Sequence, residues 1–457
     1  MATEWSSVAA SDLWMMHDLI RDNHPGPVNA EDPSFGHWLQ AGAETLSAQA
    51  RAARTEHDYR LVLLTYANGF ADGHLEVRFN APEQKFWPGF LTRMDAVDDP
   101  ARVVLVDRAP GISPGDVLVS WGTDSVCDLL AARVLRPHFN PKVPHRLRLV
   151  SSWLTVASAG DVAGQAASCR FQTDTGLRTV ELHWRPIDAV TLSHCLAKAS
   201  GIEVPAPGVR NFRGTWMISL PTFNCRGAHA AQMQDLIVSL RAHAPELYRA
   251  PRVVFDLRGN CGGDSKWGDD IAEALWGAAS VEAVKASFDA TVDWRVSQRN
   301  RDALLSNAVV MSLAGHSDSA ARSEGLARRM EQALAANVAL MREADPPTGK
   351  PPNLISPFAH TVYVLTGPHC ASACLDFLDL LDRLPGTTRA GLPTYADTNY
   401  LETAFAPLPG GLARLAYPMK VYRNRARGAD VAYQPQIAWP GGTMTDESVV
   451  RWINGLP

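Results

Sequence analysis

Two segments in the second half of the chain each join a short apolar run to a cluster of small residues and then to a helical pattern. The runs at 253–257 and 362–366 are rich in β-branched residues, which is typical of buried strands. Gly262 and Gly263 follow the first run, and Ser372 follows the second at the start of a helical pattern. We therefore expect two strand-to-helix turns, one offering backbone N–H groups and the other a hydroxyl. These are the minimum parts for acyl transfer.

From about residue 205 the sequence alternates between strand and helix patterns. Strands are expected at 214–220, 252–257 and 361–366, and helices at 228–240, 267–276 and 372–384. This alternation predicts an α/β layer with parallel strands. Residues 280–355 interrupt it, with a long helix expected over 319–342 and a proline-rich loop or mobile cover over 345–352.

The first 200 residues have a different character. Residues 1–84 carry helix-spaced apolar positions with a structural break at 24–27, whereas residues 85–200 carry short strand patterns between Gly, Pro and Asp turns. The expected strands there lie at 102–106, 116–120, 147–149 and 180–184.

Part of this β-rich region has a recognisable pattern. Gly111–Leu118, followed by Trp121-Gly122 and a helical pattern over 128–133, resembles part of a PDZ domain. The alternative is a β-rich insert that only packs. The predicted domains are therefore a helical N-terminal region (1–84), a β-rich PDZ-like domain (85–200) and an α/β core (201–457) that contains a helical insertion (280–355).

Charge and hydropathy argue against two classes of partner. The formal net charge is −5 and basic residues form no run, so nucleic acid is not an expected partner. No apolar run approaches the roughly 20 residues that a membrane helix needs, so no membrane partner is expected. No metal or organic cofactor is implied either.

The seven cysteines are odd in number and lack CxxC spacing, which favours reduced thiols and a cytoplasmic setting. The first 19 residues lack the pattern of a secretory signal, so a periplasmic or secreted protein would require that a leader had been removed. His369, Cys370 and Cys374 are too few ligands for a closed structural zinc site. We expect these two cysteines to pack as small hydrophobes beside Ser372.

Each candidate turn also has an ordinary structural interpretation. Ser372 could serve only as a helix N-cap, and the two glycines could form an ordinary turn. Asp256 and Arg258 are expected to fix the glycine turn by hydrogen bonds. The functional interpretation is favoured because the two turns together supply both a hydroxyl and backbone N–H donors.

Several motifs together resemble the S41 group of C-terminal-processing peptidases. Asp256–Gly263 (DLRGNCGG) is similar to the group's DLRxNxGG segment, and 365–373 with 391–394 resembles its nucleophile segment and following turn. Gly214–Phe223 resembles the strand that opens the catalytic core, and Asp72-Gly73-His74 resembles a segment of the tricorn and interphotoreceptor-retinoid-binding branch. The resemblance implies a layered core related to the crotonase and Clp folds.

The sequence departs from the Ser–Lys dyad of that group. The turn at 394–398 contains no lysine, and Asp397 cannot replace one because a carboxylate is anionic at neutral pH. The resemblance to the tricorn-like branch instead implies His74 as the base, a role that suits an imidazole. The alternative is a turn histidine bonded locally, with Asp72 either orienting its ring or shaping the turn.

The resemblance also implies a helper acid near the C-terminus. Asp430 precedes 431–437, which resembles the corresponding segment, while Glu402 and Lys420 are weaker candidates that more often are solvated surface charges. The implied function is a serine hydrolase, most simply a peptidase. Ser372 is its nucleophile and His74 its base, and the amides of Gly262 or Gly263 and of Ala373 form the oxyanion hole.

Two other functions stay open. A catalytically inactive protein that binds peptides or apolar ligands on the same scaffold fits the missing lysine. An acyl-CoA enzyme of the crotonase type would also use glycine-rich amides, but no basic cluster suits the CoA phosphates. The expected partner is a peptide or protein substrate, and a homo-oligomer is compatible with the sequence.

Overall fold

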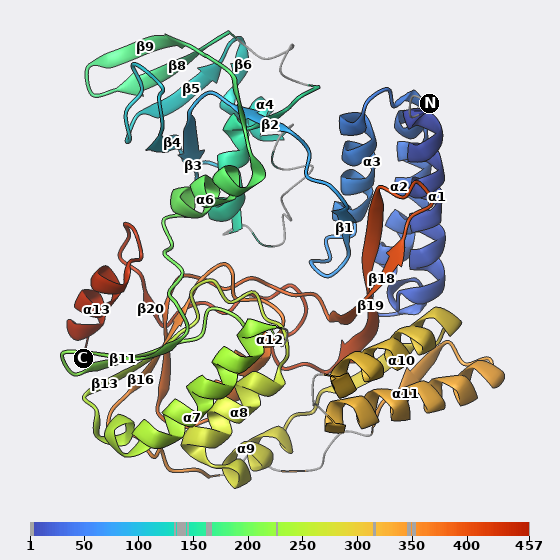
Figure 1. Cartoon of the computed structure of the whole chain (residues 1–457), viewed down its shortest axis with the longest axis vertical. Coiled ribbons are helices and arrows are strands. Elements are labelled where there is room, and N and C mark those ends of the chain that lie inside the picture. Colours follow the sequence, from blue (N-terminus) through green and yellow to red (C-terminus); the bar gives the residue numbers. More distant parts are fainter. Residues whose placement is uncertain are drawn as a thin grey trace. The chain divides into compact units, whose positions relative to one another are not determined.

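The computed structural model describes residues 4–131, 134, 143, 146–160, 167–224, 227–313, 317–344, 349 and 353–456. The chain divides into two compact units, each assembled from three separate stretches (Figure 1). The first unit comprises residues 1–196, 290–345 and 398–424, and the second comprises residues 197–289, 346–397 and 425–457. The three-domain division expected from the sequence stays a prediction.

The second unit is built on a six-stranded sheet. Its order is β11 (Gly208–Phe212), β12 (Thr215–Ser219), β13 (Arg252–Asp256), β16 (Val362–Thr366), β17 (Thr387–Gly391) and β20 (Ile437–Ala438). β11 runs antiparallel to β12, and every other neighbouring pair is parallel. The turns that follow β12, β13, β16 and β17 therefore leave the sheet at one edge, where ligands commonly bind in α/β folds.

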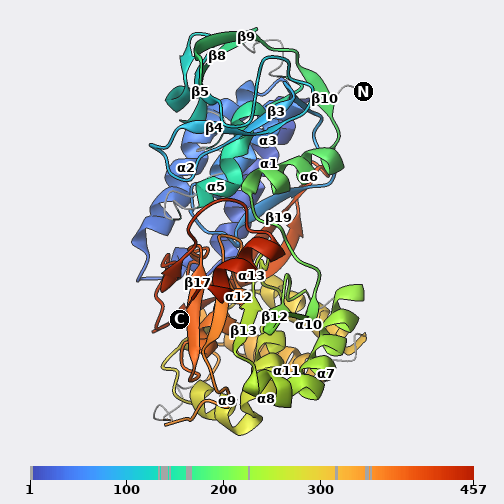
Figure 2. The same ribbon diagram turned by 90° about the vertical axis from the view of Figure 1, so that its left-hand side faces the viewer.

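Helices cover one face of this sheet (Figures 1 and 2). They are α7 (Ala228–Arg249), α8 (Lys266–Trp276), α9 (Ala278–Lys285) and α12 (Ala373–Leu381). Their apolar side chains form one core with those of β12, β13 and β16. Every residue of β16 is buried, as expected of a central parallel strand. The unit also holds α13 (Asp446–Asn454), and its sequence begins at Ala197, within α6 (Ala189–Ser200).

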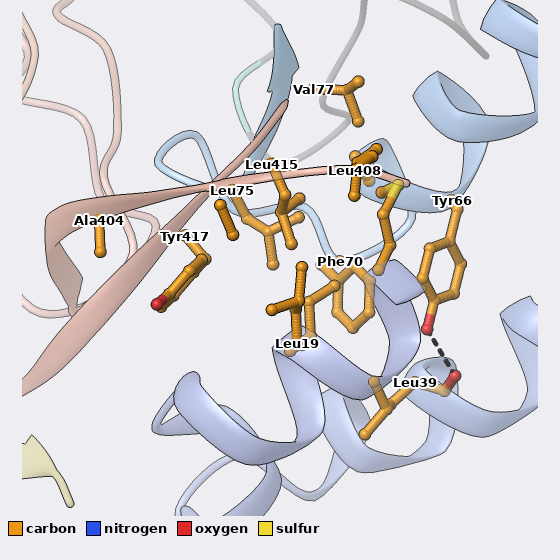
Figure 3. Packing of buried hydrophobic residues seen from close by; sticks show 14 of the residues in the cluster. Leu19, Leu39, Tyr66, Phe70, Leu75, Val77, Ala404, Leu408, Leu415 and Tyr417 are labelled. Carbon is orange, nitrogen blue, oxygen red and sulfur yellow. Dashed lines mark hydrogen bonds between the residues drawn. The ribbon is translucent and has the colours of Figure 1, made fainter. Parts of the chain in front are cut away.

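In the first unit, three N-terminal helices pack on an antiparallel sheet. The helices are α1 (Trp5–Asn23), α2 (Pro33–Ala52) and α3 (Glu56–Asn68), with the short 3-10 helix η1 (Gly26–Val28) after α1. The sheet holds β1 (Glu76–Phe79), β14 (Thr291–Arg295), β15 (Leu340–Arg342), β18 (Tyr400–Pro407) and β19 (Ala413–Arg423). Figure 3 shows their shared core, in which the Tyr66 hydroxyl donates a 2.8 Å hydrogen bond to the carbonyl of Leu39.

A second antiparallel sheet of the first unit has its own apolar core. Its order is β3 (Phe90–Arg93), β4 (Ala101–Val106), β5 (Val117–Trp121), β8 (Ser168–Thr173) and β9 (Gly176–Glu181), with β6 (Asp124–Ser125) paired to β5. A separate three-stranded sheet has the order β10 (Arg185–Ile187), β2 (Lys85–Trp87) and β7 (Ala157–Ser158). The same part of the chain holds α4 (Val126–Leu130), α5 (Leu147–Val150) and η4 (Ser151–Thr155). The helices α10 (Gln298–Leu313) and α11 (Ser317–Ala335) lie side by side in the same unit (Figure 1).

The α/β fold class is confirmed, but two predicted elements are wrong. Residues 147–149 form helix α5 rather than a strand, because so short an apolar alternation does not distinguish the two. The helix expected over 319–342 ends at Ala335, shortly before Asn337 takes a left-handed φ of 56°, and 340–342 forms strand β15. The loop expected over 345–352 lies outside the described residues except at Gly349, as does the end of the 128–133 pattern.

None of the helices in the described part of the chain combines the length and apolar character that a membrane crossing requires.

Candidate active site

Ser372 lies in the sharp turn between the buried strand β16 and helix α12. Its backbone has φ 55° and ψ −124°, a conformation that non-glycine residues adopt at a cost of about 1–3 kcal/mol. The side chain is partly exposed and makes no capping hydrogen bond to α12. The structure therefore excludes the interpretation of Ser372 as an ordinary N-cap. A strained serine on a strand-to-helix turn is the arrangement of the nucleophile elbow.

Gly262 packs directly against this turn. A Cβ atom built on Gly262 would lie 2.6 Å from the Ala371 carbonyl oxygen and 2.8 Å from the Ser372 Cβ. It would also lie 2.9 Å from the Ala373 nitrogen. Gly262 has φ 90°, so both its backbone and its surroundings require glycine. The two turns predicted from the sequence therefore meet at the carboxyl edge of the sheet.

The backbone N–H groups of Ala373 and Gly263 are candidate oxyanion donors. Neither donates a hydrogen bond to any residue that the structure describes. Ala373 follows the serine, which is the usual position of an oxyanion donor in such elbows. Gly263 has φ 140°, and a Cβ there would lie 2.1 Å from the carbonyl oxygen of Phe223, so this position also requires glycine.

Of the two glycines whose amides were expected as alternative oxyanion donors, Gly262 has an N–H that is already bonded within its own turn. Its N–H donates a 2.8 Å hydrogen bond to Oδ1 of Asn260, and the Asn260 amide in turn donates to the carbonyl of Leu220 at 2.8 Å. Asn260 is fully buried, so it uses both ends of its amide to tie the glycine turn to the segment after β12. Gly262 therefore lets the two turns pack closely together, and it does not supply a hydrogen-bond donor.

Asp256 and Arg258 fix the base of the glycine turn, as predicted. Arg258 is fully buried, and its guanidinium donates to both carboxylate oxygens of Asp256, with Nη2 at 2.7 Å from Oδ2. The same guanidinium donates to the carbonyl of Met444 at 2.7 Å and to Oδ1 of Asp446 at 2.5 Å. This fork therefore fastens the turn to the start of α13 and leaves neither residue available for substrate.

Asp397 is the site residue whose role the sequence did not reveal. It is fully buried, and its Oδ2 accepts a 2.6 Å hydrogen bond from the backbone N–H of Ser372. Two further bonds hold the segment that carries it beside the serine turn: Leu392 N–H to the Thr366 carbonyl and Tyr395 N–H to the Cys370 carbonyl, both at 3.1 Å. The only signal in the sequence was its position where the S41 group has its lysine.

Asp430 is connected to the same network. Its N–H donates a 2.9 Å hydrogen bond to the backbone carbonyl of Asp397, and its backbone has φ 58°. The segment around it is anchored on α12. Arg425 forms ion pairs with Asp376 and Asp379, Arg427 pairs with Asp379, and the Tyr433 hydroxyl donates to Asp379 at 2.6 Å. Asp430 and Ser372 are thus both tied to α12.

Cys370 and Cys374 form a disulfide that brackets Ser372. Their Cα atoms are 5.3 Å apart, within the usual range for such bonds. The expectation that these residues are reduced thiols is wrong, and so is the alternative in which they bind a metal with His369. Cys370 lies before α12, and the sharp turn at Ser372 brings it back against Cys374 in the first turn of that helix. Cys225 lies outside the described residues.

His74 belongs to the first unit, in the turn between α3 and β1. Asp72 shapes this turn, because its Oδ1 accepts hydrogen bonds from the His74 N–H at 3.0 Å and the Thr398 hydroxyl at 2.9 Å. The carboxylate therefore holds the backbone of His74 rather than its ring. Nδ1 of His74 is buried and has no hydrogen-bond partner among the described residues. Its relation to Ser372 stays a prediction.

The ring that does contact Asp72 is His24. Its Nε2 lies 3.3 Å from Oδ2 of Asp72, and its Nδ1 accepts a 2.9 Å hydrogen bond from the N–H of Gly26. Burial lowers the pKa of His24, so the imidazole is neutral and Nε2 carries the proton donated to Asp72. Burial opposes the ionisation of Asp72, but the hydrogen bond from His24 holds its pKa below the usual value. His24 is structural, as expected.

The two weaker candidates, Glu402 and Lys420, lie together in the first unit. Lys420 is buried rather than solvated, with Nζ 3.2 Å from Oε2 of Glu402 and 5.2 Å from the centre of the Trp294 ring. Glu402 has φ 60°. The interpretation of Lys420 as a solvated surface charge is therefore wrong, because the sheet around β19 encloses it.

Comparison with solved structures shows which fold this arrangement belongs to. The structure is similar to that of mature CPAF, with a TM-score of 0.63 and 13% identity over 99% of this chain and 96% of that chain. The chain has the CPAF fold. Mature CPAF complexed with lactacystin gives a TM-score of 0.62 at 13% identity, over 99% of this chain and 98% of that one. The tricorn protease gives 0.40 at 10% identity, over 98% of this chain and 37% of that one, too low to carry an argument.

The likeness to mature CPAF is a likeness of the fold. At 13% identity the likeness says nothing of activity by itself. No family model matches the chain, and no curated protein matches it. The chemistry must therefore be argued from the residues around Ser372.

Proposed function

We propose that the protein is a serine peptidase whose nucleophile is Ser372. The observation that carries the proposal is the backbone of Ser372, which holds φ 55° between β16 and α12 while its hydroxyl caps nothing. A folded protein retains strain of this kind when the surrounding structure enforces it, and such positions cluster at active sites. Gly262, Asp397 and the disulfide enforce it here.

In the proposed reaction Oγ of Ser372 attacks a peptide carbonyl, and the carbonyl oxygen becomes negatively charged. The N–H groups of Ala373 and Gly263 stabilise that charge. Donors that are already in place need no reorganisation during the reaction, and removing one typically costs about 3–4 kcal/mol. The N–H of Ser372 takes no part, since it is bonded to Asp397.

The proposed base is His74, which takes the serine proton and returns it to the leaving amine. The buried Nδ1 supports this choice over a locally bonded turn histidine, because it makes no hydrogen bond to any residue that the structure describes. Asp430 is the proposed helper acid. It belongs to a segment that is anchored on α12, the helix that follows Ser372.

The substrate class we propose is an extended peptide or protein segment. The edge strand β9 of the PDZ-like region pairs only with β8 among the described residues, and most of its residues are exposed. An extended chain end adds to such an edge through backbone hydrogen bonds. No cofactor enters this proposal, and the cytoplasmic setting stays a proposal that the disulfide no longer supports.

The test is covalent labelling with a fluorophosphonate, followed by digestion of a peptide library. We expect labelling at Ser372 in the folded protein, no labelling of Ser372→Ala, and strongly slowed labelling of His74→Ala. A protein that resists the probe and leaves the library intact while binding peptides would instead be the non-catalytic binder. Unchanged hydrolysis by Ser372→Ala would refute the nucleophile.

A further inference from the structure

The disulfide of the second unit encloses the proposed nucleophile in a five-residue loop. Cys370 precedes Ser372 by two residues, and Cys374 follows it by two. Both cysteines are fully buried, whereas Ser372 between them is partly exposed. The covalent link therefore spans the strained turn itself and no other part of the fold.

Each end of the link is held by a different element. The Cys370 carbonyl accepts a hydrogen bond from the Tyr395 N–H, on the same segment as Asp397. Cys374 lies in the first turn of α12, where its N–H donates to the carbonyl of Ala371 at 3.0 Å. The disulfide thus joins Cys370, which is hydrogen-bonded to the segment of Asp397, to the helix that presents the Ala373 amide.

The link limits how far the turn can open. Four peptide units extend up to about 13–14 Å, whereas the Cα atoms of Cys370 and Cys374 are 5.3 Å apart. Without the link, the turn could lengthen and Ser372 could leave its φ of 55° for a relaxed conformation. Such a change would move the serine hydroxyl and the Ala373 N–H together, and both are needed in the proposed reaction.

We propose that the Cys370–Cys374 disulfide is a redox-controlled positioning element for Ser372. The protein hydrolyses peptides when the bond is formed, and its catalytic rate falls when the bond is reduced. This inference rests on the proposed function. Cys370 and Cys374 are positioning residues, since they act through the geometry of Ser372 and its neighbouring amide.

The reductant we name is a dithiol. One of its thiolates attacks one sulfur of the disulfide, which forms a mixed disulfide and releases the other cysteine as a thiolate. The second thiolate of the reagent then closes its own ring and releases the first cysteine. In sum the disulfide takes up two electrons and two protons to give two thiols, and the dithiol becomes a cyclic disulfide.

The experiment compares four samples of the full chain: oxidised, reduced with dithiothreitol, reoxidised, and the Cys370→Ala/Cys374→Ala variant. Mass spectrometry after denaturing alkylation first establishes the redox state at Cys370 and Cys374. Fluorophosphonate labelling of Ser372 and peptide hydrolysis then give the rate of nucleophilic attack, kcat and KM. The variant Cys127→Ala serves as the control, because Cys127 is exposed on α4 and forms no disulfide.

We expect reduction to slow labelling and lower kcat at least tenfold, with less than a twofold change in KM and recovery on reoxidation. The double variant should be slow and insensitive to dithiothreitol, while Cys127→Ala should respond as the native protein does. Should that double variant not fold, the reduced and reoxidised native samples carry the test. Equal rates for verified oxidised and reduced protein overturn the inference alone. Absence of labelling in the oxidised protein overturns it together with the proposed function.

Discussion

The backbone N–H of Ser372 donates a 2.6 Å hydrogen bond to Oδ2 of Asp397, and the acceptor is fully buried. This hydrogen bond stabilises the strained backbone of Ser372. It also occupies the carboxylate oxygen, so the N–H of the next residue is not bonded to it. Ala373 therefore keeps its N–H without an acceptor among the described residues.

Replacing Asp397 should lower activity, and the loss should be smaller when the new side chain can still accept a hydrogen bond from the Ser372 N–H. Asp397→Asn retains an amide oxygen that can accept from Ser372, so we expect a loss of about tenfold in kcat. Asp397→Ala removes the acceptor of the partly buried Ser372 N–H, which costs about 1–3 kcal/mol at most, and we expect at least a hundredfold loss in kcat. Steady-state kinetics and urea unfolding of both variants measure these effects. Equal kcat for Asp397→Ala and native protein would contradict the role of Asp397.

Gly262→Ala should abolish activity because its methyl group would enter the turn around Ser372. The added Cβ lies within 3 Å of backbone atoms of Ala371 and Ala373, which cannot rotate away. Gly277 is the matched control, since it has a similar φ of 86° and no atom near the position of its Cβ. We expect Gly277→Ala to cost about 1–2 kcal/mol in the free energy of unfolding and to keep activity. Fluorophosphonate labelling and thermal unfolding are measured for both variants. Both variants carry the backbone strain of a positive φ, but only Gly262→Ala carries the steric clash with the serine turn.

Arg258→Lys should destabilise the second unit. A lysine ammonium cannot reproduce the fork that binds Asp256, Asp446 and the carbonyl of Met444, so buried acceptors lose their donors. We expect a loss of about 3–5 kcal/mol in the free energy of unfolding. Arg451→Lys on α13 is the control, because its pair with Glu447 is exposed and contributes little. Urea denaturation measures both variants, and similar midpoints for the two would contradict the prediction.

His24 should make the stability of the first unit depend on pH. Burial lowers the pKa of folded His24, so the unfolded chain binds a proton more readily than the folded one below about pH 6.5. The contribution of His24 is therefore complete above about pH 6.5. It falls as the pH drops toward its lowered folded pKa, at up to about 1.4 kcal/mol per pH unit. Asp72, whose folded pKa is also lowered, loses its contribution below about pH 3.9.

Urea unfolding of native protein and His24→Gln between pH 7 and pH 5 measures this dependence. We expect a shallower decline of the unfolding free energy for His24→Gln than for native protein. His37→Gln, at an exposed position on α2, should decline as the native protein does. Parallel curves for native protein and His24→Gln would show that His24 is not the group responsible.

Much of the second unit could be predicted from the sequence, because its central strands β12, β13 and β16 are almost entirely buried and its helices are amphipathic. The runs at 253–257 and 362–366 lie where strands β13 and β16 were expected, and Ser372 and Gly262 meet as the paired turns implied. A local sequence pattern is enough to predict this meeting, because the turns that follow parallel strands all lie at the same edge of the sheet.

The remaining features depend on contacts that a local pattern does not encode. Whether the N–H of Gly262 was available depended on the rotamer of Asn260, and the role of Asp397 depended on a segment that returns to the serine turn. The disulfide depends on the sharp turn between β16 and α12, which brings Cys370 back against Cys374, and not on a familiar cysteine motif. Residues 290–345 and 398–424 belong with the N-terminal unit, although they lie within the sequence of the core.

This interleaving of the two units has a consequence for the order in which the chain acquires reactivity during synthesis. Arg425, Arg427 and Asp430, which brace α12 and the segment of Asp397, leave the ribosome more than 50 residues after Ser372. Strand β20, the last strand of the sheet, follows them. A nascent chain that ends at the serine turn therefore lacks these supports, so the serine becomes organised only late in translation.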